Sequence, residues 1–298
     1  MNATNDIPTL NYGLEIGKEM DRLLIACPRR IEREWPPAFA KCYPGLGTVL
    51  MTARAAVNTF KTIQFLSVEK PKDPWQKPEF VANVLPLART LLEGVFNLYF
   101  MFGDLPNRSV AYVKSGWRDL FLETERQTAR YSSDSRWTSY LKQRVAGLDV
   151  LRERYGVTAD ESSDPRKKIA RWPSPSEMMR VDPERAGFIS YLSDWFYKEL
   201  SQVAHGHLAG LVLQSKILMR RDSVLLQGSD EEFADDLRIL RSYSFGTSIV
   251  LMLALMSEIQ IGLGFEPSLQ LRYVWMVLSS YWPASREIFD ERYGSLLK

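Results

Sequence analysis

The chain of 298 residues carries 38 Lys and Arg against 36 Asp and Glu, so its formal net charge is only +2. This balance excludes a chain-wide basic field of the kind that recruits nucleic acid or anionic lipid. With 45% apolar and 25% charged residues, the composition is that of a globular protein with a substantial core.

The two cysteines, Cys27 and Cys42, stand outside any CxxC pattern. They favour neither a disulfide framework nor a thiolate zinc site, and both suit a reducing compartment. The first twenty residues contain Asp6, Glu15 and Glu19 and no continuous apolar stretch, unlike a secretory signal. We therefore expect a cytoplasmic protein.

Apolar residues recur at i, i+3, i+4 and i+7 along almost the whole chain, and no alternating run typical of a strand occurs. Amphipathic helices are predicted within residues 49–64 and 110–124. Residues 80–102 form a more apolar helical segment, in which Pro86 either starts the helix or kinks it. The pattern predicts an all-α, multi-helix bundle in one domain spanning residues 1–298.

Further along, residues 156–173 are the most polar and least patterned segment, which favours a flexible loop over a weak domain boundary. Ser174 then stands as an N-cap before Pro175, with Glu177 at the third helical position, so a capping box should start a short helix. Asp182 and Pro183 form a second pair of N-cap residue and proline at the first helical position. They predict a helix that runs to about residue 219.

Residues 245–265 come closest to a membrane span, because residues 249–256 are continuously apolar. A span needs about 20 mainly apolar residues, and Glu258 would be costly in hydrocarbon. We expect a buried core helix there, and a membrane-associated helical protein is the competing interpretation.

The only two histidines, His205 and His207, are two residues apart. On a helix their side chains point about 200° apart, so they cannot jointly bind a metal. No HExxH pattern is present either. No metal and no cofactor are therefore expected.

Two polar stripes cross otherwise apolar helices, each at i, i+4 and i+8. Their members are Arg89, Glu93 and Asn97 on one segment, and Tyr197, Ser201 and His205 on the other. We expect the stripes to face one another, with His205 tuned as an acid or base and Arg89 able to hold a phosphate or carboxylate. The alternative is a closed hydrogen-bond network that only fixes helix register.

Three short motifs carry a resemblance: Arg89-x3-Glu93, Arg171-Trp172 before the Ser174 helix, and Tyr197-x2-Leu-Ser201-x3-His205-Gly. Together they resemble a bacterial family of uncharacterised helical proteins that is similar to HEPN-type domains. The likeness covers about residues 84–218, so the central part of the bundle is expected to be HEPN-like.

HEPN domains include metal-independent ribonucleases, often dimeric, in which an arginine and a histidine on one helix meet the scissile phosphate. Here six residues separate Lys198 from His205, so Lys198 takes the position of the family's arginine. Glu199 stands where the family usually has a polar amide. Lysine keeps the charge without the bidentate fork, and Glu199 would repel phosphate. If Arg89 supplies the guanidinium, cleavage by 2′-hydroxyl attack with His205 as base or acid is the activity that the resemblance implies.

The candidate catalytic residues are thus His205, Arg89, Glu93, Ser201, Tyr197 and Lys198. The resemblance implies a role in bacterial stress or phage defence, as a metal-independent ribonuclease or as an inactive relative that binds RNA or protein. A non-catalytic structural or interaction module is the alternative. The candidate partners are a second copy of the chain, RNA and a partner protein; no DNA signature is present, and a membrane is not expected.

Overall fold

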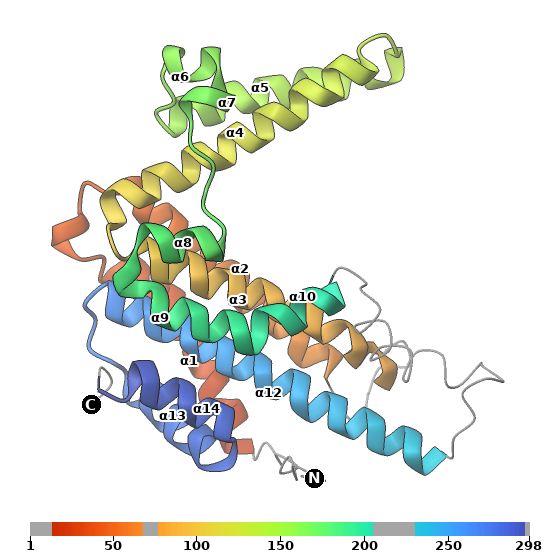
Figure 1. Cartoon of the computed structure of the whole chain (residues 1–298), viewed down its shortest axis with the longest axis vertical. Coiled ribbons are helices and arrows are strands. Elements are labelled where there is room, and N and C mark those ends of the chain that lie inside the picture. The colour runs from red at the N-terminus through yellow and green to blue at the C-terminus, as the bar shows by residue number, and fades with distance from the viewer. Residues whose placement is uncertain (1–13, 68–76, 205–229, 296–298) are drawn as a thin grey trace.

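The computed structural model describes residues 14–67, 77–204 and 230–295, and all regular elements within these ranges are helical. This confirms the predicted all-α bundle. Helix α3 (Val84–Met101) lies at its centre, with eleven of its eighteen residues buried. Helices α2 (Tyr43–Leu66), α12 (Asp230–Gly262) and α10 (Lys198–Ala204) all pack against α3 (Figure 1).

The outer elements complete the body of the bundle. Helix α1 (Leu14–Arg33) packs on α2 and on α13 (Leu269–Tyr281), which is followed by α14 (Pro283–Ile288) and the π-helical turn η5 (Phe289–Tyr293). A 3₁₀ turn, η1 (Pro37–Phe39), joins α1 to α2. Another, η2 (Pro78–Asn83), leads into α3, so Pro86 stands in the first turn of that helix. The N–H groups of the first turn have no intrahelical acceptor, so a proline there costs no hydrogen bond. Pro86 therefore marks the start of the helix and not a kink.

The apolar run at residues 249–256 lies in the core, where each side chain is at most 1% exposed. Within the described ranges, the helix Glu231–Gly262 is long and apolar enough to cross a membrane, and 72% of its apolar window is buried inside the bundle. Gly264 follows the end of α12, and its φ of 67° allows the Phe265 N–H to bond the Gln260 carbonyl.

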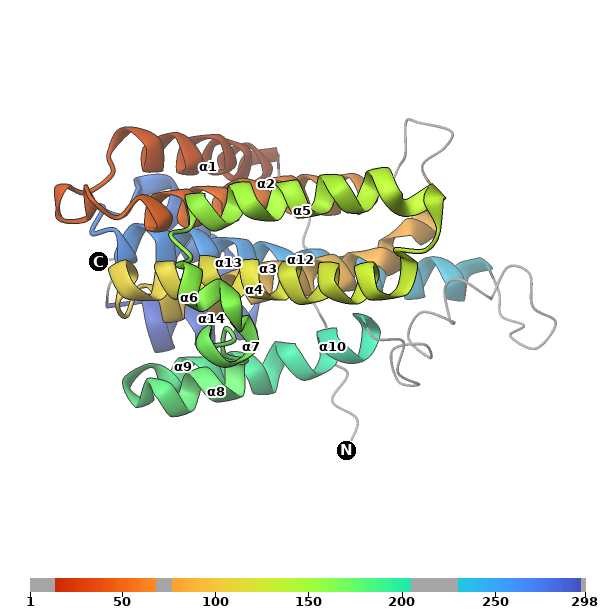
Figure 2. The same ribbon diagram turned by 90° about the horizontal axis from the view of Figure 1, so that it is seen from above.

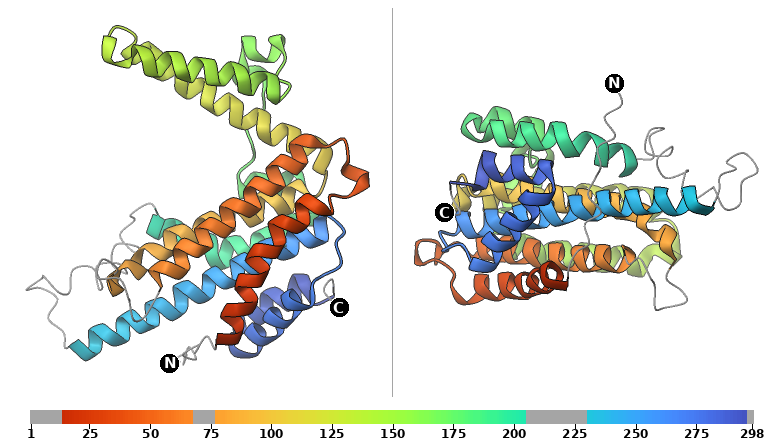
Figure 3. Two further views of the ribbon diagram at one scale, coloured as in Figure 1. Left: turned by 180° about the vertical axis from the view of Figure 1, so that it is seen from behind. Right: turned by 90° about the horizontal axis from the view of Figure 1, so that it is seen from below.

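A second, smaller core lies in a projection that we call the arm: the outer half of α4 (Leu105–Tyr131) with η3 (Ser135–Trp137), α5 (Thr138–Arg154), α6 (Ala159–Ser163) and α7 (Pro165–Lys168). Figures 1 and 3 show the arm extending away from the body. Its core consists of Trp117, Leu148, Val157 and Ile169. The segment 156–173, for which the sequence predicts a flexible loop, thus contains two short helices and contributes two side chains to this core.

The chain returns to the body through α8 (Pro175–Val181), where Ser174 and Glu177 form the predicted capping box. Helix α9 (Pro183–Leu192), the π-helical turn η4 (Ser193–Tyr197) and α10 then follow without a break. The helix predicted from Asp182 is confirmed as far as Ala204. Its remaining length, including His205 and His207, lies outside the described residues.

Candidate functional site

The packing of α10 against α3 brings the two polar stripes together. Arg89 Nη2 donates to the Tyr197 hydroxyl at 3.4 Å, and the Arg89 guanidinium carbon lies 5.2 Å from the centre of the Tyr197 ring. Arg89 Nε also donates to Glu93 Oε1 at 3.0 Å, one turn further along α3. The Arg89 side chain is 14% exposed and that of Glu93 is 48% exposed, so the ion pair is open to solvent on the Glu93 side. We call Arg89, Glu93 and Tyr197, together with Ser201 one helical turn beyond Tyr197, the Arg89 cluster.

The helix that carries Tyr197 is locally π-helical over Ser193–Tyr197. A π turn inside an α-helix weakens the regular hydrogen-bond ladder and is frequent at functional sites. Here the turn ends at the residue that contacts Arg89. Phe96 of α3 supports the Tyr197 ring from the side, with 6.0 Å between the ring centres.

Ser201 is the member of the cluster whose hydrogen bonding is incomplete. Its Oγ is buried, and it has no hydrogen-bond partner among the residues that the structure describes. Most buried hydroxyls in native proteins find a partner, so an orphaned one calls for an explanation such as a ligand or an ordered water. His205, which the sequence predicts as the acid or base of this site, lies outside the described residues.

Lys198 does not join the Arg89 cluster. Its Nζ donates to Asp194 Oδ1 at 2.7 Å, one turn back on the same helix, and both side chains are largely exposed. An exposed pair of this kind is a solvated helix face. The cation that the structure places in the cluster is therefore Arg89.

Glu199 also has a partner of its own. The Tyr243 hydroxyl of α12 donates to Glu199 Oε2 at 2.6 Å. Burial and, after it, this carboxylate raise the pKa of Tyr243 above its ordinary value. The negative charge of Glu199, which sequence reasoning placed against a phosphate, is thus committed to an interhelical hydrogen bond.

The third member of the α3 stripe, Asn97, anchors the segment that leaves the arm. Trp172 Nε1 donates to Asn97 Oδ1 at 2.8 Å, and the Trp172 backbone N–H donates to Ser115 Oγ at 2.7 Å. The Tyr112 ring packs edge-on against Trp172. Burial and, to a lesser extent, the negative charge of Glu93 raise the pKa of the Tyr112 hydroxyl. Trp172 therefore attaches the segment between the arm and α8 to α3, the helix that carries Arg89.

Sequence reasoning missed a buried ion pair on the other side of the body. Glu258 of α12 accepts from Arg292 Nε at 3.1 Å and Nη2 at 3.3 Å, and from the Tyr293 hydroxyl at 3.0 Å. The Glu258 side chain is 1% exposed. A carboxylate two positions after eight consecutive apolar residues was the available signal, because a buried charge requires a partner.

Sequence reasoning also missed that two arginines bind the backbone carbonyls at the C-terminal end of α3. Arg185 donates to the Tyr99 carbonyl and Arg108 to the Phe100 carbonyl, each at 2.6 Å. Both arginines bind Asp182, with N–O distances of 2.7 Å for Arg108 and 3.6 Å for Arg185. Asp182 stands at the N-cap of α9 as predicted, but its carboxylate serves this cluster instead of capping α9. These charges satisfy carbonyls that a helix end otherwise leaves open.

No family model matches the chain, and neither the curated proteins nor the solved structures contain a similar protein at a significant level. Within the described ranges, no three His, Cys, Asp or Glu side chains are placed to hold one metal ion.

Proposed function

We propose that the chain is a HEPN-like helical protein of bacterial stress or phage defence that acts on RNA through the Arg89 cluster together with His205. The observation that supports this best is the contact of Arg89 with Tyr197, because it joins the only described cation of the cluster to the helix that leads to His205. A guanidinium with a planar fork suits a phosphodiester oxygen pair.

The chemistry needs no metal. A base takes the proton of a ribose 2′-hydroxyl, the 2′-oxygen attacks the adjacent phosphorus, and the bond to the 5′-oxygen breaks as that oxygen receives a proton. The products are a 2′,3′-cyclic phosphate and a free 5′-hydroxyl. We assign His205 to one of the proton transfers and Arg89 to the charge on the phosphoryl oxygens.

Two features of the Arg89 cluster support a binding role over a purely internal one. Ser201 contributes a buried hydroxyl with no partner among the described residues, which a ligand or an ordered water could satisfy. Glu93 is half exposed, so the ion pair that it forms with Arg89 borders the solvent. A phosphate would then compete with Glu93 for Arg89.

A second candidate is a non-catalytic structural or interaction module, and one observation favours it. Arg89 is only 14% exposed and contacts both a carboxylate and an aromatic ring, which is also how a register-fixing arginine is held. In that case the protein contributes surfaces and not chemistry.

The two candidates separate in one experiment on the full chain. Purified wild type, Arg89→Ala and His205→Ala are incubated with a labelled single-stranded RNA in EDTA, and products are tested for a 2′,3′-cyclic end. Lys198→Ala is the matched control, because Lys198 lies on a solvated face. Cleavage by wild type and Lys198→Ala alone supports the ribonuclease. No cleavage by wild type, or equal cleavage by all four proteins, refutes it.

A further inference from the structure

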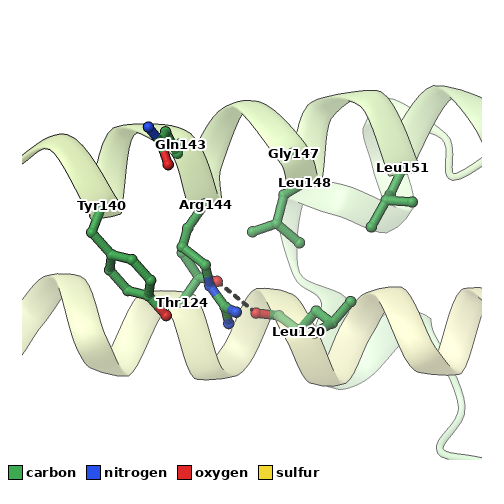
Figure 4. A pocket seen from close by; sticks show the side chains of 8 residues that line it. All are labelled: Leu120, Thr124, Tyr140, Gln143, Arg144, Gly147, Leu148 and Leu151. Atoms are coloured by element: carbon green, nitrogen blue, oxygen red, sulfur yellow. Dashed lines mark hydrogen bonds between the residues drawn. The ribbon is translucent and has the colours of Figure 1, made fainter.

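A groove runs between α4 and α5 on the arm, and it shares no residue with the Arg89 cluster. Its volume is about 270 Å³. We call it the arm groove, and it is lined by Leu120, Thr124, Tyr140, Gln143, Arg144, Gly147, Leu148 and Leu151 (Figure 4).

The lining residues recur at helical spacing on both walls. From Tyr140 to Leu151 the α5 wall rises by eleven residue steps, which is about 17 Å or three turns of helix. Leucines form most of the floor, and a side chain at Gly147 would meet no atom within 4 Å at its β-carbon. Figure 2 shows α4 and α5 running side by side over this length. The groove thus has the length and surface that a third helix requires.

Helix α5 is short of packing partners. Only Leu141 and Leu148 of its seventeen residues are buried, whereas a helix in a globular bundle usually buries three or four in every two turns. Val150 is 65% exposed and Tyr140 is 42% exposed. Of the apolar side chains that line the groove, Leu120 and Tyr140 are thus left 41% and 42% exposed by the described part of the chain.

The one charged side chain that lines the arm groove is basic. Arg144 lines the groove, no carboxylate does, and neither Arg144 nor Arg154 at the end of α5 has an ion-pair partner within the described ranges. The arginines on the opposite side of the hairpin are neutralised, with Arg152 paired to Asp149 and Arg166 to Glu125. An occupant with carboxylates complements this groove.

We propose that the arm groove binds an acidic amphipathic helix of a partner protein, with aliphatic side chains on the leucine floor and carboxylates facing Arg144. RNA fits the groove less well, because Tyr140 is the one ring on its walls and the floor is aliphatic. The other aromatic residues of the arm tip, Tyr131 and Trp137, stack on each other with 4.5 Å between ring centres. This proposal is independent of the proposed activity on RNA.

The test uses the full chain and two fluorescent model peptides of about 18 residues, long enough to cover the groove. Both carry the same leucine face, one with glutamate and one with lysine on its flanks. Fluorescence anisotropy should show that the glutamate peptide binds about tenfold more tightly, which is a difference of about 1.4 kcal/mol. Arg144→Glu should reverse the preference, and Gly147→Trp should abolish binding of both peptides.

Lys142→Glu is the matched control, since it makes the same charge change on α5 at a residue that does not line the groove. It should leave the preference unchanged. Equal affinity for both peptides, no binding of either, or the same effect from Lys142→Glu overturns the proposal. Binding of a labelled single-stranded RNA that Arg144→Glu removes, without peptide binding, overturns it in favour of a nucleic-acid surface. Circular dichroism checks that each variant folds, and Arg144→Glu decides the matter even if Gly147→Trp does not fold.

Discussion

Replacing Arg292 by methionine tests whether the buried pair with Glu258 holds η5 to α12. The methionine keeps most of the volume but leaves a carboxylate that is 1% exposed with Tyr293 as its remaining hydrogen-bond donor. Breaking one partner of a buried pair costs about 3–5 kcal/mol, because the other charge stays out of water. We expect Arg292→Met to lower the free energy of unfolding by about that amount.

Urea denaturation followed by circular dichroism measures this loss. Arg286→Met is the matched control, because Arg286 pairs with Asp290 at 3.6 Å one turn away and both side chains are largely exposed. Such surface pairs contribute about 0–1 kcal/mol, so the control should hardly move the transition. A loss for Arg292→Met no larger than that of the control would refute the reasoning.

The double variant Glu258→Gln, Arg292→Met separates charge from packing. It removes the charge that the single variant leaves unpaired, so it should be more stable than Arg292→Met alone. If the double variant is instead the less stable of the two, the side chains contribute mainly by packing and the buried charge is not the cause.

Three smaller changes test other parts of the fold. Gly103→Ala places a β-carbon 2.9 Å from Arg185 Nε and should cost about 1–3 kcal/mol in urea denaturation, and no loss would contradict the tight approach. Trp172→Phe removes the hydrogen bond to Asn97 and should cost about 0.5–1.5 kcal/mol while speeding proteolysis at residues 156–173; unchanged proteolysis would contradict the anchoring role. Hydrogen bonds from Ser174 lower the pKa of Glu177 from 4.5 to about 2, so the capping box should stabilise the fold above pH 4.5 and lose this contribution as pH falls to 2. The difference in melting temperature between wild type and Glu177→Gln should vanish over that range, and a constant difference would rule out this origin.

Local features of this fold could be predicted from the sequence because their determinants lie within a few residues. The Ser174 capping box needs only positions 174 to 177, and the start of α9 only Asp182 and Pro183. Contact between the two polar stripes could also be predicted, since polar side chains on apolar helices need one another. The contact of Arg89 with Tyr197 agrees with that expectation.

Long-range features could not be predicted in the same way. The helical pattern of residues 110–124 shows one apolar face, but its first part packs on the body and Trp117 joins the core of the arm. Nothing in that periodicity says where α4 leaves the body. The partner of Glu258 lies 34 residues away, and the π turn at Ser193–Tyr197 has no composition that marks it. Such features depend on which helices meet, which a single sequence does not specify.

Arg89 differs from the arginines that hold the body together, and the difference can be measured. Arg108 and Arg185 bind carbonyls at the end of α3, and Arg292 binds a buried carboxylate. The contacts of Arg89 described above are with a half-exposed carboxylate one turn away and with a ring face.

An i,i+4 pair contributes about 0.3–0.5 kcal/mol and a cation–π contact about 0.5–1 kcal/mol, whereas breaking a buried ion pair costs about 3–5 kcal/mol, so we expect Arg89→Met to cost less than Arg292→Met. Urea denaturation of Arg89→Met beside Arg292→Met gives the comparison. A loss for Arg89→Met as large as that for Arg292→Met would mean that Arg89 fixes helix register. A clearly smaller loss is the result expected of an arginine that binds a ligand rather than one that holds helices together.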